Sequence, residues 1–277
     1  MGLIPRSAAL VVAAVSVVAA LDAVAADSTL DEIRGRGVLR TGVIDYPPNW
    51  YRNKQTGGWE GFMIDALNDI AKVLNVKVEV VETTWANMVL DLQAKKTDIQ
   101  FGMQANPSRA LAVEFAGPLY ALSYIMINSK NFDPNNEVKT WDQYNNPRFR
   151  VSTALGAGTE TGVRRFVPEA QHVSVKSEAE AIMMVQAGRA DAFLTMTIAG
   201  LVAKAKNPDL GKFVVPLPVQ SLPSYAGLRY ENDRRWKEFI ERWAEWNRLS
   251  GTIDKWIKNS MTSLGVNPAE IPPNLTF

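Results

Sequence analysis

Strand-type and helix-type segments alternate over the first part of the chain, and this order restricts the possible folds more than any other feature. The strand-type segments are short and rich in β-branched residues, and the helix-type segments repeat apolar residues at helical spacing. In order they are a strand at Val38–Ile44, a helix at Phe62–Leu74, a strand at Val76–Val81, a helix at Trp85–Gln93 and a strand at Asp98–Phe101. This order predicts an α/β fold with a parallel sheet and right-handed crossover connections.

The carboxyl ends of these strands carry the first candidate site. In a parallel sheet the carboxyl ends share one edge, and ligands bind beyond that edge. Here the ends are Asp45–Tyr46, Thr84–Trp85 and Gly102–Gln104. Three stretches far apart in sequence are therefore predicted to form one rim.

The turn after Gly102 is suited to an anion. Gly102 has no Cβ, so its backbone can come close to a ligand. Asn106 is placed to cap a helix that begins at Pro107, and the free N–H groups of such a start attract negative charge. Arg109 follows just inside the helix, where a cation is unfavourable for the helix dipole. Two interpretations fit Arg109: a clamp on a ligand carboxylate, and a surface arginine at a helix end.

A second strand, glycine turn and helix start lie further along the chain. Phe149–Ala154 is strand-type, and Gly156–Thr159 leads into a helix. The end of this turn, Gly158 and Thr159, is again suited to an anion. It lacks the glycine fingerprint and the lysine of a nucleotide-binding loop, so a nucleotide site is weakly supported.

Composition excludes several classes of function. The chain of 277 residues has a net charge of +1, which gives no reason to expect nucleic acid. It has no Cys, so disulfides, thiolate metal sites and cysteine nucleophiles are absent. His172 is the only histidine, and catalysis would therefore rest on carboxylates, lysine or tyrosine. The sequence indicates no metal and no cofactor.

The N-terminus has the pattern of a signal peptide over residues 1–26. Arg6 is the basic start, Ala8–Ala20 is an apolar run too short for a comfortable membrane span, and Ala23–Ala26 offers small-residue cleavage sites. No Cys follows the run, which excludes a lipid anchor. We expect a soluble mature chain exported to a Gram-negative periplasm.

An aromatic stripe marks a long helix near the C-terminus. The helix is predicted to begin near Asp233 and to end at Gly251. Its apolar residues recur at helical spacing, and we interpret them as core rather than as a platform for a sugar or cofactor. They are Trp236, Phe239, Ile240, Trp243 and Leu249.

Together these segments resemble a known family. The chain is similar to the extracellular solute-binding proteins of family 3, the polar amino-acid-binding type that serves ABC importers. The segments that carry the resemblance are LDEIRGRGVLRTGV (Leu30–Val43), DYPP (Asp45–Pro48), GFMIDAL (Gly61–Leu67), TDIQFGMQANPSRALAVEFAGPLY (Thr97–Tyr120) and GRADAFLT (Gly188–Thr195). Each is loose alone, but their order and spacing are specific.

The resemblance implies a two-lobe periplasmic-binding-protein fold of type II, with a sheet flanked by helices in each lobe and two crossover strands between them. Lobe 1 would comprise residues 27–120 and 219–277, and lobe 2 residues 121–218. The ligand, a small amino-acid-like or carboxylate-bearing solute, would lie between the lobes and pass to an ABC transporter permease in the inner membrane. Nothing in the sequence demands more than a monomer.

The resemblance also assigns site residues. The family's carboxylate-binding arginine falls on Arg109, its aromatic walls on Tyr46 and Trp85, and its backbone contacts near Gly102 and Gln104. In lobe 2 the carboxylate-binding turn falls on Gly158 and Thr159.

One position departs from the family pattern. An Asp that pairs the ligand's α-ammonium usually stands five residues after the Asp of the GRADA segment, and here that position is Met196. Glu160 or Asp45 could compensate, or the ligand could lack a conventional α-ammonium. On the second interpretation, the ligand keeps a carboxylate for Arg109 and presents either no α-ammonium or an N-substituted one.

Two other functions compete with solute capture. Some relatives on this fold are cyclohexadienyl dehydratases, and the stretch Thr83–Met88 (TTWANM) is similar to theirs. A dehydration needs a placed proton donor, and the loop Thr195–Ala199 contains no acid. The third possibility is the sensor module of a receptor, which would normally be fused to a membrane span.

Overall fold

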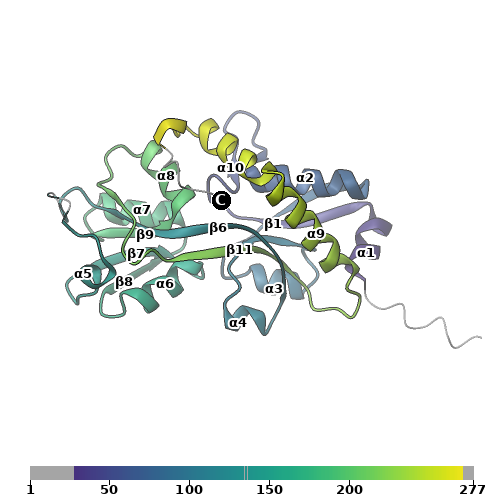
Figure 1. The fold of residues 1–277 in the computed structure, drawn as a ribbon, viewed down its shortest axis with the longest axis horizontal. Coiled ribbons are helices and arrows are strands. Elements are labelled where there is room, and N and C mark those ends of the chain that lie inside the picture. Colours follow the sequence, from purple (N-terminus) through teal and green to yellow (C-terminus); the bar gives the residue numbers. More distant parts are fainter. Residues whose placement is uncertain (1–27, 134, 136, 271–277) are drawn as a thin grey trace, which may run out of the picture.

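Two groups of helices lie at opposite ends of a pair of long strands (Figure 1). The strands are β6 (Glu114–Asn128) and β11 (Ser221–Leu228), which pair antiparallel. The computed structural model describes residues 28–133, 135 and 137–270. The predicted signal peptide over 1–26 lies outside the described residues.

Lobe 1, the half with the N-terminal helix, is built from both ends of the chain. Figure 1 shows a helix from the C-terminal part of the chain, Arg235–Leu249, beside the N-terminal helix, Thr29–Arg36. Its elements are α1 (Thr29–Arg36), β1 (Val38–Val43), β2 (Tyr51–Arg52), β3 (Trp59–Glu60), α2 (Phe62–Leu74), β4 (Lys77–Glu82), α3 (Met88–Gln93), β5 (Gln100–Met103), α4 (Pro107–Ala110), α9 (Arg235–Leu249), α10 (Thr252–Ser263) and the 3-10 helix η2 (Pro268–Glu270).

Lobe 2, the opposite half, is formed by the chain between the two long strands. Its elements are α5 (Trp141–Tyr144), β7 (Arg150–Ala154), α6 (Gly158–Phe166), β8 (Gln171–Val175), α7 (Glu178–Gln186), β9 (Ala192–Met196), α8 (Thr197–Lys206) and β10 (Phe213–Val214).

The parallel arrangement predicted for the first part of the chain is present in lobe 1. Strands β1 and β4 pair parallel, with Val38 opposite Lys77 and Val43 opposite Glu82. A parallel bridge from Thr41 to Ile99 connects them to the segment before β5. The carboxyl ends of these strands therefore point to one edge, and β5 pairs antiparallel with β11 on its other side.

Lobe 2 repeats this design. Strand β7 pairs parallel with both β8 and β9, so the chain leaves all three strands at the same edge and enters α6, α7 and α8 from there. Strand β6 pairs antiparallel with β9, and β10 pairs antiparallel with β6.

Strand β6 changes its partner as it passes from one lobe to the other. Its residues up to Ser123 pair with β11, and those from Tyr124 onward pair with β9. The lobe boundaries expected at 120/121 and 218/219 stay predictions; the first lies inside β6 and the second just before β11.

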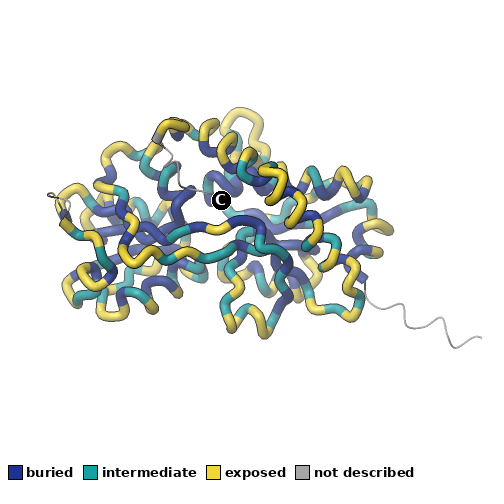
Figure 2. Tube along the Cα trace, viewed as in Figure 1, coloured by how far each residue is buried: buried dark blue, intermediate teal, exposed yellow. Residues whose placement is uncertain are grey.

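The helices alternate between buried and exposed residues along their length (Figure 2), and their buried residues are mostly apolar. Helix α2 has the predicted bounds and buries Met63, Leu67 and Ile70. Helix α9 buries Trp236, Ile240 and Trp243, as expected of a core stripe. Leu249 does not belong to this face; it is 75% exposed, because at 3.6 residues per turn it lies on the opposite side from Trp236. None of the described helices is long and apolar enough to cross a membrane.

In each lobe an arginine forms the same pair of hydrogen bonds to an aspartate. In lobe 1 the backbone N–H of Arg40 donates to Asp98 Oδ2 at 2.8 Å, and its Nη2 donates to Asp98 Oδ1 at 2.9 Å. In lobe 2 the backbone N–H of Arg150 donates to Asp191 Oδ2 at 2.8 Å, and its Nη2 donates to Asp191 Oδ1 at 2.7 Å. Asp98 lies just before β5 and Asp191 just before β9. Each arginine–aspartate pair therefore connects two strands, β1 with β5 and β7 with β9, at the edge of the sheet away from the cleft.

Candidate functional site

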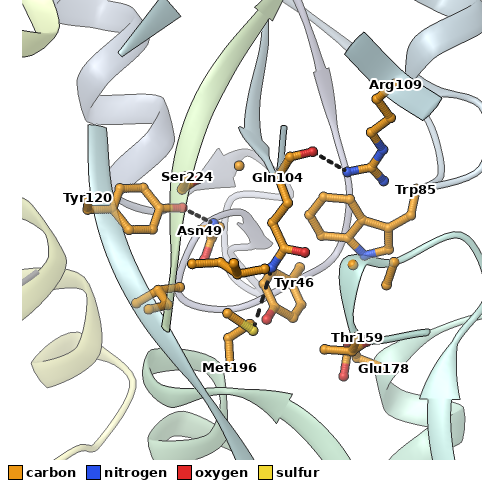
Figure 3. Close-up of a pocket in the computed structure, with 15 residues that line it drawn as sticks. Tyr46, Asn49, Trp85, Gln104, Arg109, Tyr120, Thr159, Glu178, Met196 and Ser224 are labelled. Carbon is orange, nitrogen blue, oxygen red and sulfur yellow. Dashed lines mark hydrogen bonds between the residues drawn. The ribbon is translucent and has the colours of Figure 1, made fainter. Parts of the chain in front are cut away.

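One cavity lies where the two lobes face each other. Its empty space is about 490 Å³, including the part open to solvent. Every residue predicted to contact a ligand lines it: Tyr46, Trp85, Gly102, Gln104 and Arg109 from lobe 1, and Gly158, Thr159 and Met196 from lobe 2. It is also lined by Asn49, Tyr120, Leu122, Ala157, Glu178, Leu222 and Ser224. Figure 3 shows Arg109 and Trp85 on one side, with Thr159, Glu178 and Met196 opposite.

Arg109 enters the cavity from the short helix α4. Asn106 caps that helix as predicted, because its side-chain oxygen accepts from the Arg109 N–H at 2.9 Å. The guanidinium donates to two backbone carbonyls, that of Gly156 at 2.9 Å and that of Gln104 at 3.4 Å. Burial lowers the pKa of Arg109, and no described carboxylate forms a salt bridge with it. A guanidinium has five N–H donors, so several remain for a ligand.

Aromatic rings form one wall of the cavity. The ring centroids of Tyr46 and Trp85 are 5.4 Å apart, and the rings meet edge to face at 82°. Trp50 packs behind Trp85 with centroids 6.2 Å apart, and it is completely buried. Trp50 also lies against Gly102, where an added Cβ would be 3.1 Å from its ring. Gly102 has a φ of 71°, so this close approach needs a residue without a side chain.

Trp85 lies in the turn before α3 and not inside a helix. The predicted helix start at Trp85 is wrong, because the backbone turns at Thr84 and α3 begins only at Met88. The N–H groups of Asn87 and Met88 both donate to the Thr84 carbonyl, at 3.0 and 3.1 Å. This turn brings the Trp85 ring to the cavity, where its buried Nε1 has no hydrogen-bond partner.

Gln104 crosses the cavity with its side chain. Its Nε2 lies 3.7 Å from the sulfur of Met196, and Tyr124 Oη donates to its Oε1 at 3.4 Å. The side chain lies against Gly158, where any Cβ would collide with the amide. The sequence assigned Gln104 a backbone role, and the structure shows that its side chain fills part of the cavity as well (Figure 3).

The start of α6 supplies polar groups from lobe 2. Its N-cap is Ala157, which offers no side-chain hydrogen bond to the first N–H groups of the helix. The Glu160 N–H donates to the Ala157 carbonyl at 3.1 Å, whereas the N–H groups of Gly158 and Thr159 donate to no described residue and so suit an anion. Thr159 is 3% exposed, and its hydroxyl has no hydrogen-bond partner.

Glu178 is the charged residue of the cavity wall that sequence reasoning missed. It is the first residue of α7 and is 8% exposed, and its Oε2 has no hydrogen-bond partner. Burial raises the pKa of its carboxyl to about 8. A signal was available: β8 is parallel to β7, so the loop after β8 reaches the same edge as the turn at Gly158. Applying the carboxyl-end rule to the second lobe finds Glu178.

This geometry agrees with comparisons to known proteins. The model of the bacterial extracellular solute-binding proteins, family 3, matches residues 39–261. The chain belongs to this family.

Relatives of this solute-binding protein include both binding proteins and an enzyme. A cyclohexadienyl dehydratase of Pseudomonas aeruginosa is 25% identical over 233 residues, 83% of this chain and 84% of its own length. The glutamate/aspartate import solute-binding protein of Escherichia coli is 25% identical over 261 residues, 88% of this chain and 84% of its own. Most of the curated relatives are named as binding proteins.

Solved structures share the two-lobe fold. The ancestral amino acid-binding protein AncCDT-1, a precursor of cyclohexadienyl dehydratase, superposes with a TM-score of 0.75 at 32% identity, over 84% of this chain and 100% of that one. A solute receptor for L-cysteine of Neisseria gonorrhoeae has a TM-score of 0.76 at 20% identity, over 89% of this chain and 98% of that one. This solute-binding protein therefore has the type II periplasmic-binding-protein fold.

The acids that the sequence offered as substitutes at Met196 do not line the cavity. Glu160 accepts from the Gly156 N–H at 2.8 Å and from Arg164 Nη2 at 2.8 Å, which engages both of its oxygens. Asp45 lines a neighbouring hollow instead. Among the residues that line the cavity, Glu178 is the one that carries a carboxyl group.

Proposed function

We propose that this solute-binding protein captures a small amino-acid-like, carboxylate-bearing solute between its lobes and delivers it to the permease of an ABC importer. Arg109 is the observation that carries the proposal. It is a cation at the wall of an interlobe cavity, with no described acid paired to it. A ligand carboxylate would form charge-assisted hydrogen bonds with the guanidinium in a partly water-excluded space.

Capture would proceed by closure of the lobes. The ligand would contact Arg109 and the aromatic wall in lobe 1, and Thr159 and the start of α6 in lobe 2. A ligand that binds both lobes favours the closed form, since that is the state in which all contacts are made. Strands β6 and β11 form the flexible connection.

Relatives' names support the amino-acid class. They include binding proteins for glutamate/aspartate, glutamine and L-cystine. AncCDT-1, which is 32% identical, is described as an amino acid-binding protein and as an ancestral cationic amino acid solute binding protein. With the predicted signal peptide, these names support export to the periplasm. We further propose that the protein acts there as a monomer.

The proposal is tested by a thermal-shift screen against the twenty standard amino acids, L-cystine and simple carboxylates. A ligand at about 100 times its dissociation constant should stabilise the protein by roughly 2.7 kcal/mol. X-ray scattering with the best ligand should then show a smaller radius of gyration at saturation. No change in radius with a verified ligand would contradict closure.

A dehydratase is the second candidate, and Glu178 is the observation that favours it. An acid whose pKa is raised to about 8 is largely neutral at pH 7 and would donate a proton to a leaving hydroxyl group. The curated dehydratase covers 83% of this chain, but the loop Thr195–Ala199 offers no acid. Incubation with prephenate separates the two functions: product formation that is lost in the Glu178→Gln variant would establish the enzyme.

A further inference from the structure

We propose that Glu178 binds a cationic nitrogen of the ligand, so that the cavity selects molecules carrying both a carboxylate and a positive charge. This inference rests on the proposed function, since it takes the cavity to be the ligand site. It replaces the expectation, drawn from Met196, that the ligand lacks an ordinary α-ammonium.

The first argument is the lack of a partner for the Glu178 carboxyl. The residue is 8% exposed and lines the cavity, and its Oε2 makes no hydrogen bond. Buried carboxyl groups in proteins are normally paired or hydrogen-bonded, because desolvation penalises the free ion. No described lysine or arginine forms a salt bridge with it. A cation on the ligand would provide the partner that the Glu178 carboxyl lacks.

The second argument is the arrangement of charge around the cavity. Arg109 on the lobe 1 side has no acid partner, and Glu178 on the lobe 2 side has no basic partner (Figure 3). One wall therefore holds an unpaired cation and the other an unpaired carboxyl. A molecule with both charges satisfies the two groups at once, whereas a plain carboxylate would leave Glu178 without a partner.

The cation could come from the α-ammonium or from the ligand's side chain. Glu178 and Tyr46 also line a second hollow between the lobes, with Ile182 and Phe193 as apolar walls. Asp45 and Lys206 line that hollow too, and Tyr46, Arg109 and Tyr120 are the other titratable residues that line the central cavity. An α-ammonium would reach Glu178 from the central cavity, and a cationic side chain would reach it on the way into the second hollow.

The experiment compares matched ligands by calorimetry. The probe is the strongest binder among the twenty amino acids, set against the same carbon skeleton without its α-amine. If that binder has a charged side chain, a neutral isostere is the third probe, as L-citrulline is for L-arginine. In the wild type, the charged molecule should bind more tightly than at least one of its analogues.

Glu178→Gln keeps the shape and removes the charge. We expect it to reduce the preference for the charged molecule at least fivefold, measured as the ratio of the two dissociation constants. If the ratio against the analogue without the α-amine changes, Glu178 binds the α-ammonium. If the ratio against the neutral isostere changes, Glu178 binds the charged side chain. A smaller change in both ratios would overturn the inference. Glu169→Gln, an exposed residue in the same lobe, is the matched control and should change neither ratio.

A rescue variant guards against an indirect effect of Glu178→Gln. Met196 lines the same cavity, so the double variant E178Q/M196D returns a carboxylate to it from the neighbouring strand. If Glu178 binds the α-ammonium of the ligand, the double variant should restore part of the lost preference for the ligand that carries this group.

Failure of the inference and failure of the proposed function give different results. If the wild type binds no amino acid or carboxylate, both are wrong. If it binds an amino acid and Arg109→Ala abolishes binding, while Glu178→Gln leaves the ratios unchanged, only the inference is wrong.

Discussion

Gln104 from lobe 1 lies over Gly158 in lobe 2 so closely that a Cβ on Gly158 would be 1.7 Å from Gln104 Oε1. The atoms in the way belong to the end of the flexible Gln104 side chain, so a Cβ on Gly158 would require that amide to move. Gly158 has no positive φ, and the constraint is therefore contact across the cleft rather than backbone conformation.

Replacing Gly158 with Ala should weaken binding about tenfold, which corresponds to ~1.4 kcal/mol. The added methyl group displaces the Gln104 amide and opposes closure, while the start of α6 tolerates alanine. Adding Gln104→Ala should restore affinity, because the obstructed side chain is gone. Gly35→Ala is the control, since a Cβ there meets nothing within 4 Å. Calorimetry measures the binding affinities of these variants. If the double variant binds the ligand no more tightly than Gly158→Ala, contact with Gln104 is not the cause of the loss.

Replacing Arg109 with Ala should cost on the order of 2–5 kcal/mol of binding free energy, since a partly desolvated carboxylate would lose its partner. Lysine should rescue only in part, because it cannot form the planar fork. The fold should survive both changes. Arg242→Ala, whose side chain is 79% exposed on α9, is the control. Binding by Arg109→Ala within a factor of three of the wild type would rule out the role.

Glu178 should make the empty protein less stable as the pH rises. Its pKa is raised from 4.5 to about 8 in the folded state, so between these values the folded protein binds more protons than the unfolded chain. The unfolding free energy therefore falls with increasing pH across this window, by on the order of 3–5 kcal/mol in total. Glu178→Gln removes this dependence and should be the more stable protein at pH 8.5.

Denaturant titrations of both proteins at pH 5 and pH 8.5 measure this difference. Other groups with shifted pKa values, such as His172 and Asp65, are present in both proteins, so their contributions cancel. Equal pH dependence of the two unfolding free energies would show that Glu178 is not the buried acid described here.

Asp98→Asn should destabilise lobe 1 more than Asp191→Asn destabilises lobe 2. The Asp98 side chain is fully buried among Arg36, Arg40 and Arg229, while the Asp191 side chain is 20% exposed and paired with Arg150. Breaking a buried charge cluster costs about 3–5 kcal/mol, and a partly exposed pair costs less. Urea denaturation of the two single variants compares them, and equal losses would refute the ranking.

Local signals predicted most of lobe 1. The bounds of α2 follow from its apolar periodicity, and the start of α4 follows from Asn106 and Pro107. The start of strand β6 has no local signal, because Gly117 and Pro118 are typical of a break although the strand continues through them. Helix α3 begins three residues later than expected, since the turn at Thr84 depends on where the Trp85 ring packs.

Most of the candidate site was also predictable from the sequence, with Glu178 as the main exception. The eight residues expected at the ligand site line one cavity, because the carboxyl ends of parallel strands must meet at one edge, whereas Glu160 and Asp45 do not line it. Glu178 was missed, since a first helical residue usually faces water and its burial depends on contact between the lobes. Local sequence cannot report that contact.

Lobe 1 is completed by helices from the far end of the chain. Trp236 donates from its indole N–H to the Asp98 carbonyl at 3.2 Å, and Trp243 donates to Asp69 Oδ2 at 2.7 Å. A ribosome therefore finishes nearly the whole polypeptide before the first lobe can close its core. Lobe 2, made from one uninterrupted stretch, has all its strands earlier in synthesis. The half of the protein whose synthesis begins first is thus the half whose core is completed last.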